Sequence, residues 1–397
     1  MGRTPGKRAV RARGPRRAVS ASAPARGQEG FTLVEIMVTL VISVFVLAAA
    51  SQMFASLLTQ FKQQGKVAET SIEAAVGLEI LRRDLNSAGF GLPWSLGGET
   101  YLEAPTGTDP AAFNDATSNP PRAIIANNPA FTTLNDSDYL VVKSASVARN
   151  PASGKWTNLS SDNSRRSWTP AAQNLAPNDR VIVITPSVSN AIALVSAGGF
   201  STRFDNPANS SSSGSTYNFR PPDVFETRVI YGIDPDNDLR MPFNRADYYI
   251  SSNGVPARCA PGTGVLVKAV LDHADGDFDL DGDGSADELP LLDCVADMQV
   301  VFRRDTNDDG TIDNTTDDIS ALNAAQTRDQ VREARVYILA HEGQRDPTYT
   351  YPSSTIYVGD TSIGSGRSFD LATQIGTGWE NYRWRIYAVV EKPENLR

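Results

Sequence analysis

The most distinctive hydropathy pattern of the chain is a long apolar run near its amino terminus, from Phe31 to Phe54. In these 24 residues Glu35 is the only ionisable side chain. An α-helix rises about 1.5 Å per residue, so a helix of this length spans a hydrocarbon core of about 30 Å. The pattern therefore predicts a transmembrane helix over residues 31–54. An ionised carboxylate at membrane depth costs about 2.5 kcal/mol or more, so Glu35 indicates a functional position.

The helical pattern continues over residues 55–90. No proline occurs between Ala55 and Asn86, and apolar residues recur there mostly at intervals of three, four and seven. We expect this stripe to pack on a globular body, with Gly65 and Gly77 as points where the helix bends easily. The stripe consists of Leu58, Phe61, Ala68, Ile72, Val76, Ile80 and Leu85.

Residues 91–397 have the short runs that are typical of β-strands. These runs are rich in β-branched and aromatic residues and are bounded by Gly, Pro, Asn or Asp. With the long helix they predict an α+β fold, in which the helix packs on a large antiparallel β-rich domain. The nine predicted strands are Tyr139–Lys143, Arg180–Thr185, Ala191–Val195, Thr227–Tyr231, Asp247–Ser251, Val265–Val270, Met298–Arg303, Arg335–Ala340 and Trp384–Val390.

The segment before the apolar run, residues 1–30, is strongly basic. It holds eight Lys and Arg residues against one acid, Glu29, so the positive-inside rule predicts that this end stays in the cytoplasm and the rest of the chain crosses the membrane. An ordinary secretory signal has a shorter apolar core followed by a small-x-small cleavage site, and neither feature is present. Cleavage before the run, at the small residue Gly30, would leave the helix on the mature protein.

Charge argues against one large class of function. The whole chain carries 37 basic and 46 acidic residues, a net charge of −9, and removal of residues 1–30 leaves 29 basic and 45 acidic residues, a net charge of −16. Proteins that bind nucleic acid generally carry a basic patch that neutralises phosphates, and residues 31–397 contain no dense run of Lys or Arg. We expect no nucleic-acid partner.

The segment Gly30-Phe31-Thr32-Leu33-Val34-Glu35 resembles the class III signal of type IV pilins and type II secretion pseudopilins. This resemblance implies that a membrane prepilin peptidase cuts between Gly30 and Phe31 and methylates the new amino terminus of Phe31. It also implies that Glu35, the fifth mature residue, neutralises the terminal ammonium of a neighbouring subunit, so that both charges are paired inside the fibre. The alternative is a generic amino-terminal anchor with an incidental acid.

A second resemblance favours one branch of this family. Residues 78–91 resemble the helix exit of PilW-type minor pilins, in which a basic pair, an acid followed by leucine and an Ala-Gly-aromatic turn succeed one another. Gly89 or Gly91 is suited to the left-handed conformation that ends a helix. Residues 294–302, 332–339 and 382–387 also resemble parts of PilW-like proteins.

Two cysteines, Cys259 and Cys294, lie in the part of the chain expected across the membrane. Because that space is oxidising, we expect one disulfide between them in preference to two free thiols.

Two acidic loops, residues 277–288 and 305–316, have the spacing by which an EF-hand type loop wraps Ca²⁺ with oxygen ligands. In the first, Asp279, Asp281, Asp283 and Asp287 stand at positions 1, 3, 5 and 9, with glycine at position 6; a second register starts at Asp277 and places Glu288 at position 12. In the other loop, Asp305, Asn307, Asp309 and Asp313 stand at positions 1, 3, 5 and 9. We expect Ca²⁺ in at least one loop; the alternative is that both are solvated turns.

The sequence contains no catalytic motif that would indicate an enzyme. Its two histidines, His273 and His341, have no zinc-type spacing, and there is neither a Gly-x-Ser-x-Gly elbow nor a Gly-rich phosphate loop. We expect both histidines to be surface or structural residues.

These features lead to the hypothesis of a PilW-like minor pilin. The resemblance implies that it is inserted in the inner membrane with its body in the periplasm, is processed by prepilin peptidase, and joins the pilus fibre through other pilins and the assembly platform, near the tip or in the priming complex. Two alternatives are a J-type pseudopilin of a type II secretion system and a calcium-dependent tip adhesin.

Overall fold

The structure is a computed structural model that describes residues 30–127, 131–186, 192–205 and 216–396. The chain forms two compact units, residues 1–60 and 61–397. Except for Gly30, the basic leader lies outside the described residues.

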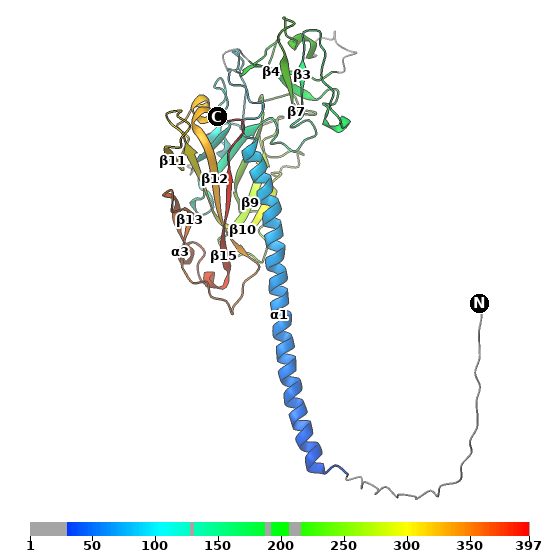
Figure 1. The fold of residues 1–397 in the computed structure, drawn as a ribbon, viewed down its shortest axis with the longest axis vertical. Helices are drawn as coiled ribbons and strands as arrows, with labels where there is room; N and C mark the ends of the chain where they lie inside the picture. The colour runs from blue at the N-terminus through cyan, green and yellow to red at the C-terminus, as the bar shows by residue number, and fades with distance from the viewer. Residues whose placement is uncertain (1–29, 128–130, 187–191, 206–215, 397) are drawn as a thin grey trace, which may run out of the picture. The chain divides into compact units, whose positions relative to one another are not determined.

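The first element is α1 (Leu33–Asn86), a helix of 54 residues without proline (Figure 1). Within the first unit its side chains are exposed on every face, including the large apolar ones between Leu33 and Leu58. Within the second unit one face is buried at intervals of one, three and four residues, as expected for a helix against a sheet. This buried face consists of Thr70, Ala74, Gly77, Leu81, Asp84 and Leu85.

The predicted apolar stripe was therefore mostly wrong. Ile72 and Val76 are 66% and 62% exposed, and Phe61 is exposed as well, whereas Leu85 is buried and Ile80 is partly buried. The helix approaches the sheet through Ala74 and Gly77, whose small side chains let the two backbones come close.

At Gly77 the backbone of α1 lies close to strand β10 (Leu289–Arg304). A Cβ atom on Gly77 would lie 1.8 Å from the carbonyl oxygen of Leu291, well inside van der Waals contact. Gly77 therefore serves a close packing contact within a continuous helix. Gly65, by contrast, has no atom within 4 Å of the Cβ position.

This contrast predicts opposite effects of the same substitution. Alanine is a better helix former than glycine by about 1 kcal/mol, so Gly65→Ala should leave the free energy of unfolding unchanged or raise it. Gly77→Ala should lower it by about 3 kcal/mol, because helix and strand must separate to accommodate the methyl group. Thermal unfolding of the full-length protein in detergent, followed by circular dichroism, checks both; equal melting temperatures would contradict the contact.

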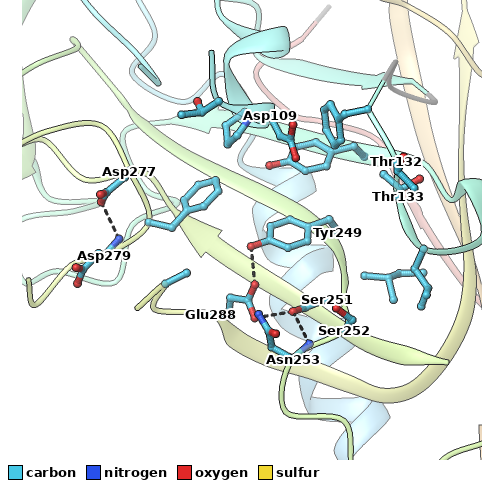
Figure 2. A pocket seen from close by; sticks show the side chains of 18 of the residues that line it. Asp109, Thr132, Thr133, Tyr249, Ser251, Ser252, Asn253, Asp277, Asp279 and Glu288 are labelled. Carbon is cyan, nitrogen blue, oxygen red and sulfur yellow. Dashed lines mark hydrogen bonds between the residues drawn. The ribbon is translucent and has the colours of Figure 1, made fainter. Parts of the chain in front are cut away.

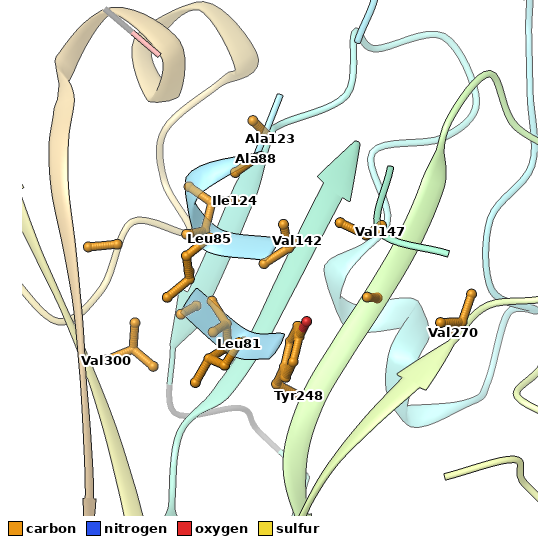
Figure 3. Packing of buried hydrophobic residues seen from close by; sticks show 14 of the residues in the cluster. Leu81, Leu85, Ala88, Ala123, Ile124, Val142, Val147, Tyr248, Val270 and Val300 are labelled. Atoms are coloured by element: carbon orange, nitrogen blue, oxygen red, sulfur yellow. The ribbon is translucent and has the colours of Figure 1, made fainter. Parts of the chain in front are cut away.

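The helix face also carries a buried acid. Asp84 accepts hydrogen bonds from the Tyr248 hydroxyl and the Lys268 ammonium group, both of which lie on the sheet. Asp84 and Lys268 are 5% and 4% exposed, so removing one charge would leave the other buried without its partner. Figure 3 shows Leu81 of α1 beside Tyr248, with Leu85 near Ile124 and Val142.

The helix packs on a large antiparallel sheet. Its strand order is β1-β2-β8-β9-β10-β12-β15, and β11 pairs with β10. β10 is its longest strand and pairs along most of its length with β12. The other strands are β1 (Ile124–Asn127), β2 (Tyr139–Ser144), β8 (Asn244–Ser251), β9 (Gly264–Val270), β11 (Asn314–Thr316), β12 (Val331–Glu342) and β15 (Arg383–Glu391).

Two smaller sheets complete the body. One has the order β3-β7-β4-β5, with β6 paired to β4, and the other is the β13-β14 hairpin. Their strands are β3 (Trp156–Leu159), β4 (Arg180–Pro186), β5 (Ile192–Leu194), β6 (Ser201–Arg203), β7 (Arg228–Asp234), β13 (Thr355–Asp360) and β14 (Ser365–Asp370). Two short helices, α2 (Ala324–Gln330) and α3 (Leu371–Gln374), flank β12 and the hairpin.

All nine predicted strands are present, and the α+β class is confirmed. The strand expected at Ala191–Val195 is β5, although Ala191 itself lies outside the described residues. Most of the unpredicted strands are short or polar, which leaves too few apolar residues to show an alternation. The exception is β13, which has six residues and includes Ile356, Tyr357 and Val358. The helix exit is as expected: α1 ends at Asn86, and both Gly89 (φ 84°) and Gly91 (φ 71°) are left-handed.

Candidate functional site

The predicted cleavage position lies immediately before α1. Gly30 and Phe31 are both exposed, and the first helical hydrogen bonds are donated by the backbone N–H groups of Glu35 and Ile36 to the carbonyl oxygen of Thr32, at 3.1 and 3.2 Å. A Cβ atom on Gly30 would have no neighbour within 4 Å among the described residues. The Gly30–Phe31 peptide bond therefore lies outside the helix, between two exposed residues, and is open to an enzyme.

Glu35 lies in the first turn of α1, and its side chain is exposed. Its backbone N–H also faces the Thr32 hydroxyl oxygen, at 3.3 Å, so Thr32 caps the helix. Within the described residues, no hydrogen bond or ion pair engages the Glu35 carboxylate. A carboxylate in this position interacts favourably with the positive end of the helix dipole and remains free for a partner outside the chain.

The helix that follows is long and apolar enough to cross a membrane. An 18-residue window of α1 has a mean hydropathy of 2.6, and none of this window is buried against the rest of the protein. Among the described residues, α1 is the one helix that is long and apolar enough to cross a membrane.

The first acidic loop is held by its own backbone. Asp279 accepts hydrogen bonds from the N–H groups of Gly282 at 2.8 Å and Gly284 at 2.7 Å, and Asp281 accepts one from Asp283 at 3.2 Å. The N–H of Gly284 is the main influence that holds the pKa of Asp279 below its ordinary value. One carboxylate oxygen from each of Asp279, Asp281 and Asp283 lies within 4.8 Å of the other two. Three converging carboxylates suit a hard cation such as Ca²⁺.

The second acidic loop shares most of its side-chain-to-backbone hydrogen bonds with the first. In both loops the acid at position 1 accepts from the N–H groups of positions 5 and 6; here Asp305 accepts from Asp309 at 3.2 Å and from Gly310 at 3.0 Å. In both loops position 9 accepts from the N–H of position 2, here Asp313 from Thr306 at 3.0 Å. The two loops therefore share one backbone geometry, in the register that starts at Asp279 and Asp305.

The loops differ in how their charge is compensated. Arg332 of β12 donates to Asp305 at 3.0 Å and to Asp308 at 3.1 Å, and position 3 is the neutral Asn307. Burial by itself raises the pKa of Asp305, but Arg332 and the backbone N–H groups outweigh it and hold this pKa below its usual value. The first loop has no Lys or Arg bonded to the three converging acids among the described residues. It is therefore the better candidate for a cation.

The register that starts at Asp277 finds less support in the geometry. Glu288 accepts hydrogen bonds from the Tyr249 hydroxyl at 2.7 Å and the Ser251 hydroxyl at 2.8 Å, and it does not belong to the group of converging carboxylates. Asp277 accepts from the N–H of Asp279 at 2.8 Å and is not part of the converging group.

The expected disulfide is present. Cys259 and Cys294 are joined with an S–S distance of 2.03 Å and a Cα–Cα distance of 4.9 Å. The bridge closes a segment that contains the first acidic loop and β9, so it limits the separation of the loop's two ends in the unfolded chain.

Both histidines are structural. His273 and His341 are 4% and 2% exposed, and burial lowers the pKa of each to about 3. Each neutral ring accepts a backbone N–H, from Arg240 at 3.3 Å and from Ala260 at 2.9 Å respectively.

A cavity of about 890 Å³ lies beside the first acidic loop, and the sequence did not indicate it. Its lining includes four aromatic rings from separate segments of the chain, so no spacing along the chain could have marked it. Figure 2 shows this cavity with Tyr249 and Glu288 hydrogen-bonded at one wall. The four aromatic residues are Phe131, Tyr139, Tyr249 and Phe278.

Comparison with known proteins supports the amino-terminal site. Residues 25–51, which include Gly30, Phe31 and Glu35, match the family described as the prokaryotic N-terminal methylation motif. No curated protein and no solved structure matches the chain. The motif is a prepilin-type signal and supports a type IV pilin-like protein, either a pilin or a pseudopilin, that prepilin peptidase processes. Together with the apolar helix it supports membrane anchoring followed by incorporation into a fibre.

Proposed function

We propose that the protein is a minor pilin of the PilW type, present at low copy in a type IV pilus, near its tip or in the complex that primes assembly. The observation that carries the proposal is the exposed Gly30–Phe31 bond directly before an apolar helix, with Glu35 in the first turn and the methylation motif over residues 25–51. Before assembly the helix holds the protein in the inner membrane, with the amino terminus in the cytoplasm and the body in the periplasm.

The size and charge of the body favour low copy. Residues 91–397 form a body of about 300 residues, and the chain without its leader has a net charge of −16. In a helical fibre the subunits stack at close spacing, so bodies of this size would collide and their like charges would repel. At a tip, or as an occasional subunit, the body has room.

Deletion of the gene in the native host tests this role. We expect loss of surface fibres while the major pilin accumulates in the membrane. In sheared wild-type fibres, mass spectrometry should find the protein at a small fraction of the most abundant subunit. Normal fibres with a defect in protein secretion would favour the J-type pseudopilin instead, and equal amounts of the two subunits would contradict the minor role.

We also propose that the first acidic loop binds Ca²⁺ through Asp279, Asp281, Asp283 and Asp287. The convergence of three carboxylate oxygens within 4.8 Å supports this ligand set, and the Arg332 guanidinium beside Asp305 makes the second loop the weaker site. Calcium sites of extracellular modules have dissociation constants of about 10⁻⁴ to 10⁻³ M.

A matched pair of substitutions separates the two loops. Asp283→Asn and Asp309→Asn both change position 5 and keep the oxygen that accepts a backbone N–H. Isothermal titration of the full-length protein with Ca²⁺ should show an affinity at least about tenfold lower for Asp283→Asn and little change for Asp309→Asn, because only the first loop lacks a compensating guanidinium. At 10 mM Ca²⁺ the melting temperature of the wild-type protein should rise by about 2 °C. No heat and no rise in melting temperature would remove calcium from the proposal.

A further inference from the structure

The cavity beside the first acidic loop lies entirely within the second unit of the chain. Its walls come from β8 at Tyr249, the segment before β2 at Phe131, and the loop that contains Phe278 and Glu288. A volume of about 890 Å³ is within the range of pockets that hold small ligands or a few side chains of a peptide.

The aromatic rings of this cavity form a connected row. Tyr139 and Tyr249 are stacked, with ring centroids 5.3 Å apart and planes 2° from parallel. Phe131 stands edge-on to Tyr139 at 5.5 Å, and Phe278 lies 6.2 Å from Tyr249. The faces of such rings are electron-rich and attract cations, most strongly where water is excluded.

The charged groups of the cavity have a single sign. Its lining includes the carboxylates of Asp109, Asp277, Asp279 and Glu288, and no Lys, Arg or His is among the described residues that line it. Glu288 is held in place by hydrogen bonds from the Tyr249 hydroxyl at 2.7 Å and the Ser251 hydroxyl at 2.8 Å. Each of its oxygens has a further lone pair available to a ligand. Figure 2 shows that Glu288 lies beside Tyr249.

We propose that this cavity binds an organic cation with an apolar body, either the side chain of a lysine or arginine in a peptide or a free alkylamine. The ammonium or guanidinium group lies against Glu288 and the face of Tyr249, and the aliphatic part lies along the other rings. An anion would face four carboxylates, and a neutral ligand would leave their charge uncompensated, so charge complementarity selects a cation. This inference rests on the cavity and does not depend on the fibre assignment.

Calorimetric titration of the full-length protein tests the proposal, without calcium and in a non-ionic polyoxyethylene detergent, which brings neither a sugar nor a cationic head group. We expect n-butylammonium to bind with a dissociation constant of about 1 mM and n-butanol, its neutral counterpart, to bind at least about tenfold more weakly. The peptide Ala-Lys-Ala distinguishes the two sources: tighter binding than n-butylammonium indicates a peptide ligand, and equal or weaker binding indicates a free amine.

Three variants assign the binding to this cavity. Glu288→Gln should weaken n-butylammonium binding at least about fivefold, and Phe278→Leu should weaken it about threefold through loss of one ring face. Glu394→Gln, the same change at an exposed position outside the cavity, should have no effect. If the Glu288→Gln variant does not fold, the affinity of the Phe278→Leu variant for n-butylammonium decides whether the ligand binds in this cavity. The proposal would be overturned if n-butanol bound as tightly as n-butylammonium, or if a neutral hexose bound more tightly than n-butylammonium. It would also be overturned if neither cation bound, or if the cavity variants bound n-butylammonium with unchanged affinity.

Discussion

Replacement of Gly30 by leucine should leave the whole protein unprocessed in the membrane and absent from fibres. A prepilin peptidase must bring the Gly30–Phe31 bond into its active site, and a glycine lets the backbone approach closely because it has no side chain. Mass spectrometry should find residues 1–30 retained on the variant, whereas the wild-type protein should begin at Phe31 and carry one additional methyl group. We expect a loss of processing that is essentially complete.

The structure indicates that this substitution affects processing without disturbing the folded body. A Cβ atom at Gly30 would meet no other atom within 4 Å among the described residues, so the substitution has no packing through which to disturb the body. Gly27→Leu, the same change three residues upstream, serves as the matched control and should be processed normally. If the leucine variant at Gly30 were cut like the wild-type protein, or if the wild-type protein kept residues 1–30, the prepilin assignment would fail. The second of these outcomes would indicate an uncleaved amino-terminal anchor.

The fold was predictable where the chain repeats one pattern over many residues. The helix is unbroken by proline from Leu33 to Asn86, and most of the nine strands found from sequence contain runs of β-branched or aromatic residues. The buried face of the helix was not predictable in the same way. Its contact depends on Ala74 and Gly77, whose importance comes from the carbonyl oxygen of Leu291, more than 200 residues away along the chain.

The candidate sites, like the elements of the fold, were predictable where their residues lie close together along the chain. The acidic loops are local, so the spacing of their acids was enough to predict two loops, and the structure gives both one hydrogen-bonding pattern. The difference in charge compensation between the two loops comes from Arg332, which lies on β12, 27 residues after Asp305. The cavity is the extreme case: its rings meet only because β2, β8 and two loops are brought together by the sheet.

Replacement of Glu35 by valine should allow processing and abolish entry of the protein into the fibre. The proposed role of the carboxylate is to pair with the terminal ammonium of a neighbouring subunit, and loss of one partner of a buried ion pair costs about 3 kcal/mol or more. This cost corresponds to a fall of about a hundredfold in association. The measurement is the ratio of the variant in sheared fibres to the variant in the membrane, by immunoblot, with cleavage confirmed by mass spectrometry.

The valine variant alone does not separate a contact with a neighbouring subunit from an effect of residue 35 on its own helix. Thr32 and Glu35 have the spacing of a capping box, in which the residue three positions after the cap stabilises the start of the helix. Glutamine supports a capping box as well as glutamate does, but it carries no charge. Glu35→Gln should therefore preserve the helix start and fail in assembly as severely as Glu35→Val, because the neighbouring ammonium still lacks its counter-charge. If the glutamine variant entered fibres normally, Glu35 would act on its own helix, and the subunit contact assigned to it would have to lie elsewhere on α1.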